Sequence, residues 1–98
     1  MSSNEIKIGS KNVFLDLGFS SQEAENLRIR SELMDQITTL IETQNWSIGA
    51  ASTYLGTSIE SVEALHQGKI GQFSIEQLMT MLTYTGMRIH VEVLPAAA

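Results

Sequence analysis

Two short apolar patterns on either side of Gly56 constrain the fold of this chain more than any other feature. Ser47 and Ser58 stand where each pattern begins, and serine is a favoured helix cap. Gly56 fits the position just past a helix end, where a left-handed backbone is needed. Small and apolar residues that can meet in a helix–helix seam lie on both sides of this glycine, at Ala51, Ser52, Leu55, Val62 and Leu65. The sequence therefore predicts two helices that cross steeply through a tight turn, a helix-turn-helix.

Capping signals place further helices on both sides of this pair. Ser20-Ser-Gln-Glu23 reads as a capping box, in which the serine hydroxyl and the glutamate carboxylate each satisfy a free backbone amide. Apolar residues then recur at three- and four-residue steps and predict one long helix over residues 21–43. Ser74 and Gln77 repeat the signal and predict another helix, which ends at Gly86. Arg28 and Arg30 lie off the apolar stripe of the long helix, so we expect both in solvent.

Both ends of the chain carry strand-like patterns. The segment Asn12–Gly18 is rich in strand-forming residues and stops at a glycine. The segment Met87–Leu94 alternates apolar and polar residues, as a half-buried strand does, and Pro95 ends it. We expect Met87–Leu94 to pair with Val13–Leu17, within one subunit or between two. The predicted fold is mainly α, a bundle of four to five helices with short N- and C-terminal strands. It divides into a flexible segment 1–11, a domain over 12–95 and a tail 96–98.

Composition narrows the functional classes. The chain has 98 residues, enough for one domain, and it contains no cysteine, so thiolate chemistry and disulfides are excluded. We find no nucleophile with a placed base, no paired carboxylates and no cofactor fingerprint, so we expect neither an enzyme nor a cofactor. No apolar run has the length of a signal peptide or a membrane span, and we expect a cytoplasmic protein without a membrane partner. The net charge of −5 is acidic for a nucleic-acid binder.

Two other residue patterns have more than one interpretation. Trp46 precedes a helix cap between apolar stretches, which favours packing in the core or helix seam over stacking on a nucleic-acid base. Glu63 and His66 lie one helical turn apart and could form half of a metal site. Without cysteine or a third ligand nearby, a pair of surface side chains is the favoured interpretation, and we expect no metal.

The order of these motifs resembles a known family. The spacings from Ser52 to Gly56, from there to Val62 and on to Leu65 are four, six and three residues, and they match the phage-repressor/Cro class of the motif, with a lambda-repressor-like bundle. The chain as a whole resembles the short HigA-type regulators and antitoxins of the XRE family. The resemblance covers roughly residues 12–95, and its four motifs are these: Asn12-x-Phe14-x-Asp16-Leu17-Gly18, the helix-turn-helix of Ser47–Lys69, Gly68-Lys69…Phe73-Ser74, and Gly86-x-x-Ile89-x-Val91-x-Val93-x-Pro95.

The resemblance implies a transcriptional repressor that binds double-stranded DNA as a homodimer. Proteins of this kind often also neutralise a RelE-like toxin. The second helix of the motif would enter the major groove. Residues expected at the DNA are Ser47, Ser58, Ile59, Glu60, Ser61, Glu63, Ala64, Gln67 and Lys69. We expect the dimer interface to contain Met87, Ile89, Val91 and Val93.

The predicted recognition helix departs from the family pattern. Family members usually have a glutamine after the cap, where this chain has Ile59, and small or basic residues next, where it has Glu60 and Ser61. They have a serine after the anchor at Val62, where this chain has Glu63. Isoleucine can contact a thymine methyl but cannot read adenine, and glutamate can accept from cytosine N4 while it repels phosphate. Phosphate contacts would come from Lys69, the helix N-termini, and Arg28 or Arg30. An alternative therefore stays open: a protein-interaction module that kept the fold and lost DNA binding.

Overall fold

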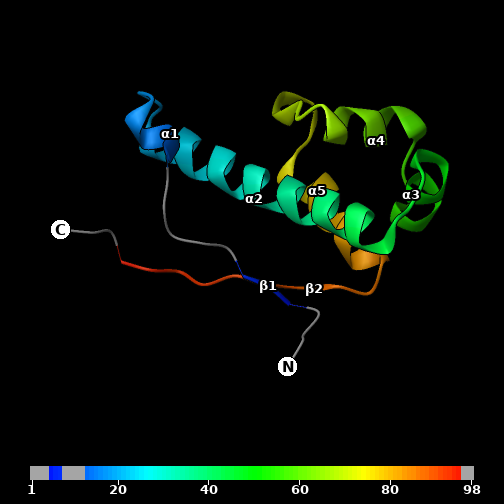
Figure 1. Ribbon diagram of the computed structural model, residues 1–98. Coiled ribbons are helices and arrows are strands. Elements are labelled where there is room, and N and C mark those ends of the chain that lie inside the picture. The colour runs from blue at the N-terminus through cyan, green and yellow to red at the C-terminus, as the bar shows by residue number, and fades with distance from the viewer. Residues whose placement is uncertain (1–4, 8–12, 96–98) are drawn as a thin grey trace.

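The computed structural model describes residues 5–7 and 13–95, and for residues 5–7 it describes the backbone alone. These residues form a mainly helical domain, as predicted. The elements in chain order are β1 (Glu5–Lys7), α1 (Val13–Asp16), α2 (Ser21–Gln44), α3 (Ile48–Leu55), α4 (Ile59–His66), the 3-10 helix η1 (Ile70–Gln72), α5 (Ile75–Tyr84) and β2 (Arg88–His90) (Figure 1). No helix in the described ranges is both long and apolar enough to cross a membrane.

The long helix α2 confirms the capping prediction. The Ser20 hydroxyl oxygen accepts a hydrogen bond from the Glu23 backbone amide at 3.2 Å, and the Glu23 carboxylate accepts one from the Ser20 amide at 3.4 Å. The helix ends at Asn45, whose φ of 56° is left-handed. Asparagine tolerates this conformation better than other residues with a side chain, which explains why the helix stops there.

The core lies between α2, α3, α4 and α5. The second predicted capping box is also present, because the Ser74 hydroxyl accepts from the Gln77 amide at 3.1 Å and the Gln77 side chain accepts from the Ser74 amide at 2.8 Å. It starts α5 with one face toward α2. The fully buried large side chains of the core are Leu33, Ile37, Leu55, Val62, Leu78 and Leu82.

The predicted strand at Asn12–Gly18 is wrong. Residues Val13–Asp16 form the short helix α1, and the Leu17 and Gly18 amides donate to the carbonyls of Phe14 and Leu15 at 3.2 and 3.1 Å. Strand-forming residues make a strand only where a neighbouring strand satisfies their backbone groups. Here turns satisfy these groups locally.

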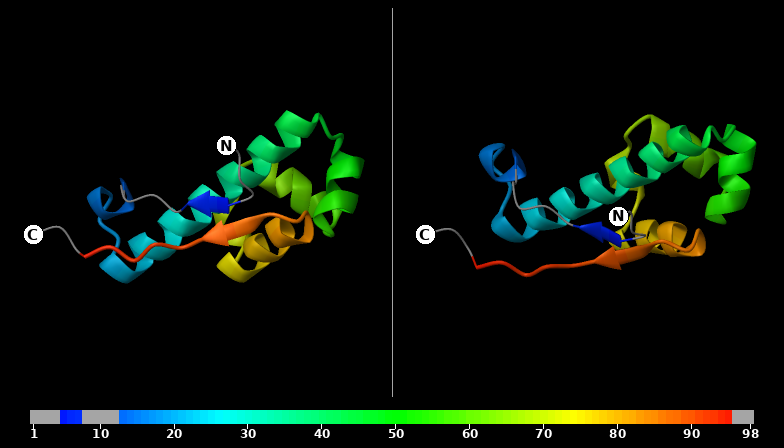
Figure 2. Two further views of the ribbon diagram at one scale, coloured as in Figure 1. Left: turned by 90° about the horizontal axis from the view of Figure 1, so that it is seen from below. Right: turned by 60° about the horizontal axis from the view of Figure 1, so that its bottom comes forward.

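The two strands lie on the side of α2 opposite α4 (Figures 1 and 2). Strand β1 pairs in parallel with β2, with Ile6 opposite Ile89. The expected pairing of Met87–Leu94 with Val13–Leu17 is therefore wrong: the N-terminal strand lies earlier in the chain, within the segment 1–11 that we expected to be flexible. Strand β2 is also shorter than predicted, because its described ladder with β1 spans three residues. The expected alternation holds within it, since Ile89 is half-buried between two exposed residues.

Candidate nucleic-acid interface

Helices α3 and α4 form the predicted steep pair. Gly56 has a φ of 65°, and the Thr57 amide donates to the Ser52 carbonyl at 2.9 Å, which closes the end of α3. Ala51, Leu55, Val62 and Leu65 are all at most 2% exposed. Four of the five residues predicted for the seam are therefore buried, while the fifth, Ser52, is half-buried. The seam fixes α4 against α2 and α3.

Serine caps orient the N-terminal ends of both helices. The Ser47 hydroxyl accepts from the Ala50 amide at 3.1 Å, and the Ser58 hydroxyl accepts from the Ser61 amide at 3.1 Å. The first amides of a helix have no partner within it, and they carry the positive end of the helix dipole. Two such ends in one motif are suited to bind phosphate oxygens.

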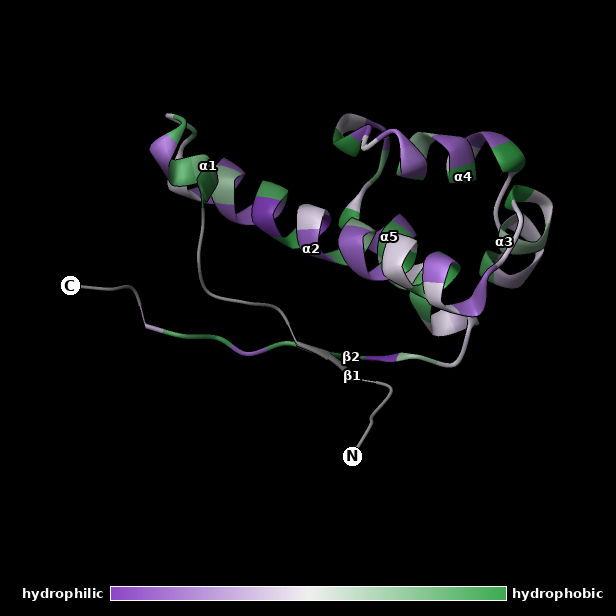
Figure 3. Ribbon diagram, viewed as in Figure 1, coloured by the Kyte–Doolittle hydropathy of each residue, from purple (hydrophilic) through white to green (hydrophobic). Residues whose placement is uncertain are grey.

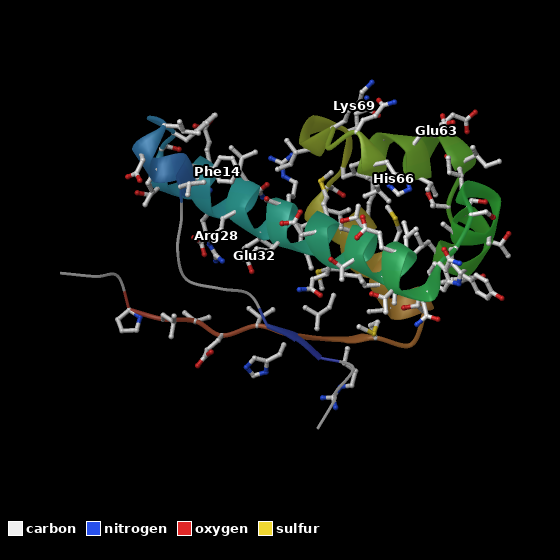
Figure 4. The ribbon with its side chains drawn as sticks, in the orientation of Figure 1. Phe14, Arg28, Glu32, Glu63, His66 and Lys69 are labelled. Atoms are coloured by element: carbon white, nitrogen blue, oxygen red, sulfur yellow. The ribbon has the colours of Figure 1, made fainter. Side chains whose placement is uncertain are left out.

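The outer face of α4 is polar and acidic. Ser58, Glu60, Glu63 and Gln67 are exposed, and Ile59 exposes 49% of its surface among them. Glu63 and Lys69 point away from the body of the molecule (Figure 4). The face presents two carboxylates and one ammonium group, so its charge is less favourable for DNA than that of an ordinary basic recognition helix.

Two residues that we expected at the DNA are less accessible. Ala64 is only 6% exposed and belongs to the hydrophobic core. Ser61 is half-buried, and its hydroxyl accepts a hydrogen bond from the Ser58 hydroxyl at 3.1 Å. Of the nine predicted contact residues, the structure thus brings seven to the surface of the motif: Ser47, Ser58, Ile59, Glu60, Glu63, Gln67 and Lys69.

The expectation that Arg28 lies in solvent is wrong. Arg28 is 8% exposed, and its guanidinium donates to Glu32 at 3.0 Å and also to Glu25. The hydrogen bond to Glu25 raises the pKa of Arg28, so the group keeps its charge. Arg28 and Glu32 lie on the side of α2 that faces the strands, away from α4 (Figure 4). Arg28 is therefore not placed to contact a phosphate bound at α4.

Arg30 is also bound to other groups of the chain and does not extend freely into solvent. It is half-buried, and its guanidinium donates to the Ile70 carbonyl at 3.0 Å and to the Asn26 side chain at 2.7 Å. These bonds tie α2 to η1. Lys69 is the remaining cationic side chain on the described part of the helix-turn-helix, and it is exposed.

Glu63 and His66 do not converge on a common point. Glu63 points outward, whereas the His66 imidazole points from α4 toward α2 (Figure 4). Among the described residues, no group of three or more His, Cys, Asp or Glu side chains is placed to hold a metal ion.

The residues expected in a dimer interface divide into two pairs. Met87 and Ile89 are half-buried and pack against the core of their own chain. Val91 and Val93, which follow β2, are 62% and 91% exposed.

Exposed apolar side chains also occur on α1. Figure 3 shows the hydropathy of α1 and of the C-terminal segment. On and beside α1 they are Val13, Leu15, Leu17 and Phe19, a surface that the sequence patterns did not predict because we expected a strand there.

The arrangement of α3, the turn and α4 defines a helix-turn-helix protein. Comparison with protein families agrees: a family model described as "Helix-turn-helix domain" matches residues 13–94. The chain belongs to this family, and the match covers nearly all of the described structure. No curated protein and no solved structure matches the chain significantly.

Proposed function

We propose that this protein is a dimeric, sequence-specific DNA-binding regulator of transcription in the cytoplasm. The observation that carries the proposal is the exposed face of α4, anchored from behind by Val62 and Leu65 within a helix-turn-helix domain. In this motif the second helix lies in the major groove, with its N-terminal residues at the base edges. Ile59 would contact a thymine methyl, and Glu60 or Glu63 would accept from cytosine N4.

Dimerisation is part of the proposal because one copy offers little positive charge. Two copies related by a two-fold axis would place their α4 helices in successive major grooves, about 34 Å apart. Val91 and Val93 support a dimer through the C-terminal segment, since they are exposed beyond the short ladder of β2. Exposed, alternating apolar residues next to a strand favour pairing with another chain.

The HigA-type, XRE-family resemblance supports a finer proposal. The protein would repress its own operon as an antitoxin, and a RelE-like toxin would be its protein partner. The exposed apolar side chains of α1 supply a surface for such a partner, because contiguous apolar patches on a small domain mark interaction sites.

A titration of labelled DNA from upstream of the protein's own gene tests the proposal. Fluorescence anisotropy would be measured at two salt concentrations, with random DNA of the same length as competitor. We expect the upstream fragment to bind at least about a thousandfold more tightly than random DNA. Ile59→Ala should reduce this ratio, whereas Thr83→Ala, an exposed change on α5, should leave it unchanged. Equal binding of both DNAs, or no binding by the folded dimer, would refute the proposal.

The acidic face of α4 favours a second candidate function, a protein-interaction module without DNA binding. Glu60 and Glu63 are both exposed and would face a basic partner. Replacing them together by Glu60→Ser and Glu63→Arg should then abolish capture of that partner. In the DNA-binding case the same pair of changes raises affinity for random DNA, because repulsion from phosphates is removed. The two readouts assign the face to one function or the other.

A further inference from the structure

A surface hollow of about 460 Å³ lies where the C-terminal ends of α2 and α5 meet α3. Leu40 and Met87 are its aliphatic lining, and three aromatic residues form its rim: Trp46, Tyr54 and Tyr84. The hollow includes none of the residues that we assign to DNA contact. It is therefore a separate feature of the molecule.

The aromatic rings are held in place but remain accessible. Trp46 and Tyr54 are stacked, with ring centroids 4.7 Å apart and an interplanar angle of 15°. Tyr84 packs over Gly56, where a Cβ atom would lie 3.1 Å from its ring. Tyr54 and Tyr84 nevertheless expose 55% and 66% of their surface. Trp46 is half-buried and packs against the core. Trp and Tyr side chains that surround a depression are typical of the anchoring points of protein interfaces.

The electrostatics of the hollow favour a cation. Helix α2 ends at Gln44 and α5 at Tyr84, both in the lining, and the C-terminal end of a helix carries a partial negative charge. The faces of aromatic rings are also electronegative. Among the described residues that line the hollow, none is a lysine, arginine, aspartate or glutamate. From these residues, an entering cation thus meets neither a competing positive group nor a carboxylate that would have to lose its water.

We propose that this hollow binds an arginine side chain of a partner protein. A guanidinium group is planar, stacks on aromatic rings and is more weakly hydrated than an ammonium group. Its aliphatic stem would lie against Leu40 and Met87, which a small inorganic cation could not use. The chain's net charge of −5 would attract a basic partner over longer distances. This site does not depend on DNA binding by α4.

The only tryptophan of the chain reports directly on the hollow, because Trp46 is part of its rim. The full chain would be titrated with N-acetyl-arginine amide up to the solubility limit of the amide, at constant ionic strength, while Trp46 emission is recorded. The control ligand is N-acetyl-citrulline amide, which has nearly the same shape and no charge. We expect a saturable change with the arginine amide, and binding of the citrulline amide weaker by about fivefold or more.

Variants at Tyr84 distinguish a role of its aromatic ring in binding from a general effect on folding. Tyr84→Phe keeps the aromatic face and should bind normally, whereas Tyr84→Ser should weaken binding by about fivefold or more. Met79→Ser, on an exposed part of α5 outside the hollow, is the matched control and should have no effect. Circular dichroism would verify that each variant is folded. Equal affinity for the two amides, or no saturable change, would overturn the proposal even if DNA binding is confirmed.

Discussion

Two glycine-to-alanine substitutions in the helix-turn-helix should have opposite effects on stability. Gly56 has a φ of 65°, and a left-handed conformation is unfavourable for alanine by about 1–2 kcal/mol. The new Cβ would also lie 3.1 Å from the Tyr84 ring, but that ring is 66% exposed and can move outward, so we expect the steric contribution to be the smaller one. The expected loss in the free energy of unfolding for Gly56→Ala is thus about 1–2 kcal/mol.

Gly49 provides the contrast within the same motif. It lies in the first turn of α3, its φ is not left-handed, and a Cβ added there would meet nothing within 4 Å. Alanine should therefore stabilise the helix by about 0.5–1 kcal/mol. The two variants should differ by about 1.5–3 kcal/mol, which corresponds to roughly 6–24 °C in Tm for a domain of this size.

Thermal and urea unfolding, followed by circular dichroism at one fixed protein concentration, would measure both changes. A third variant, Gly56→Asn, has the same Cβ but tolerates the left-handed backbone better. It should lose clearly less stability than Gly56→Ala. Equal losses for these two variants would mean that the contact with Tyr84 dominates, and a destabilising Gly49→Ala would contradict the reasoning about helix propensity.

Three further predictions test other parts of the structure. Lys69→Ala should make the slope of log K against log salt for DNA binding shallower by about 1.8, because a dimer loses two phosphate contacts; an unchanged slope would remove Lys69 from the interface. Ser74→Ala should lower the free energy of unfolding by about 1 kcal/mol in urea titrations, since the Gln77 amide loses its acceptor, while Ser31→Ala within α2 serves as a non-capping control. Val93→Glu should shift the protein from dimer to monomer in analytical ultracentrifugation without loss of helix, and a persistent dimer would exclude Val93 from the interface.

Local features of the fold could be predicted from the sequence because their causes are local. The capping boxes at Ser20 and Ser74 need only residues three positions apart, and both form. The left-handed backbone at Gly56 follows from the need to end α3 and start α4 within three residues. The apolar seam around Val62 follows from helical periodicity. These features were sufficient to predict the helix-turn-helix.

Features that depend on distant segments could not be predicted in this way. The segment around Val13 has the composition of a strand, but the strand that pairs with β2 is β1, at Glu5–Lys7. Arg28 lies off the apolar stripe of α2, yet it is buried, and its guanidinium pairs with Glu25 and Glu32 on the side of α2 that faces away from α4 (Figure 4). A single apolar stripe indicates one covered side of a helix and gives no signal for a second. The stacking of Trp46 on Tyr54 likewise required the fold.

The acidic face of α4 would affect the affinity of this protein for specific and for non-specific DNA to different extents. A carboxylate close to a phosphate is repelled by about 1 kcal/mol at 4 Å even in water, and this repulsion acts on every DNA sequence alike. At a site where Glu60 or Glu63 accepts a hydrogen bond from cytosine N4, part of the repulsion is compensated, and elsewhere it is not. Carboxylates on a recognition helix therefore weaken non-specific binding more than specific binding, which raises specificity at the expense of affinity. For this protein the ratio of specific to non-specific binding is thus a more informative quantity than Kd alone, and a modest Kd is what the charge of α4 leads us to expect.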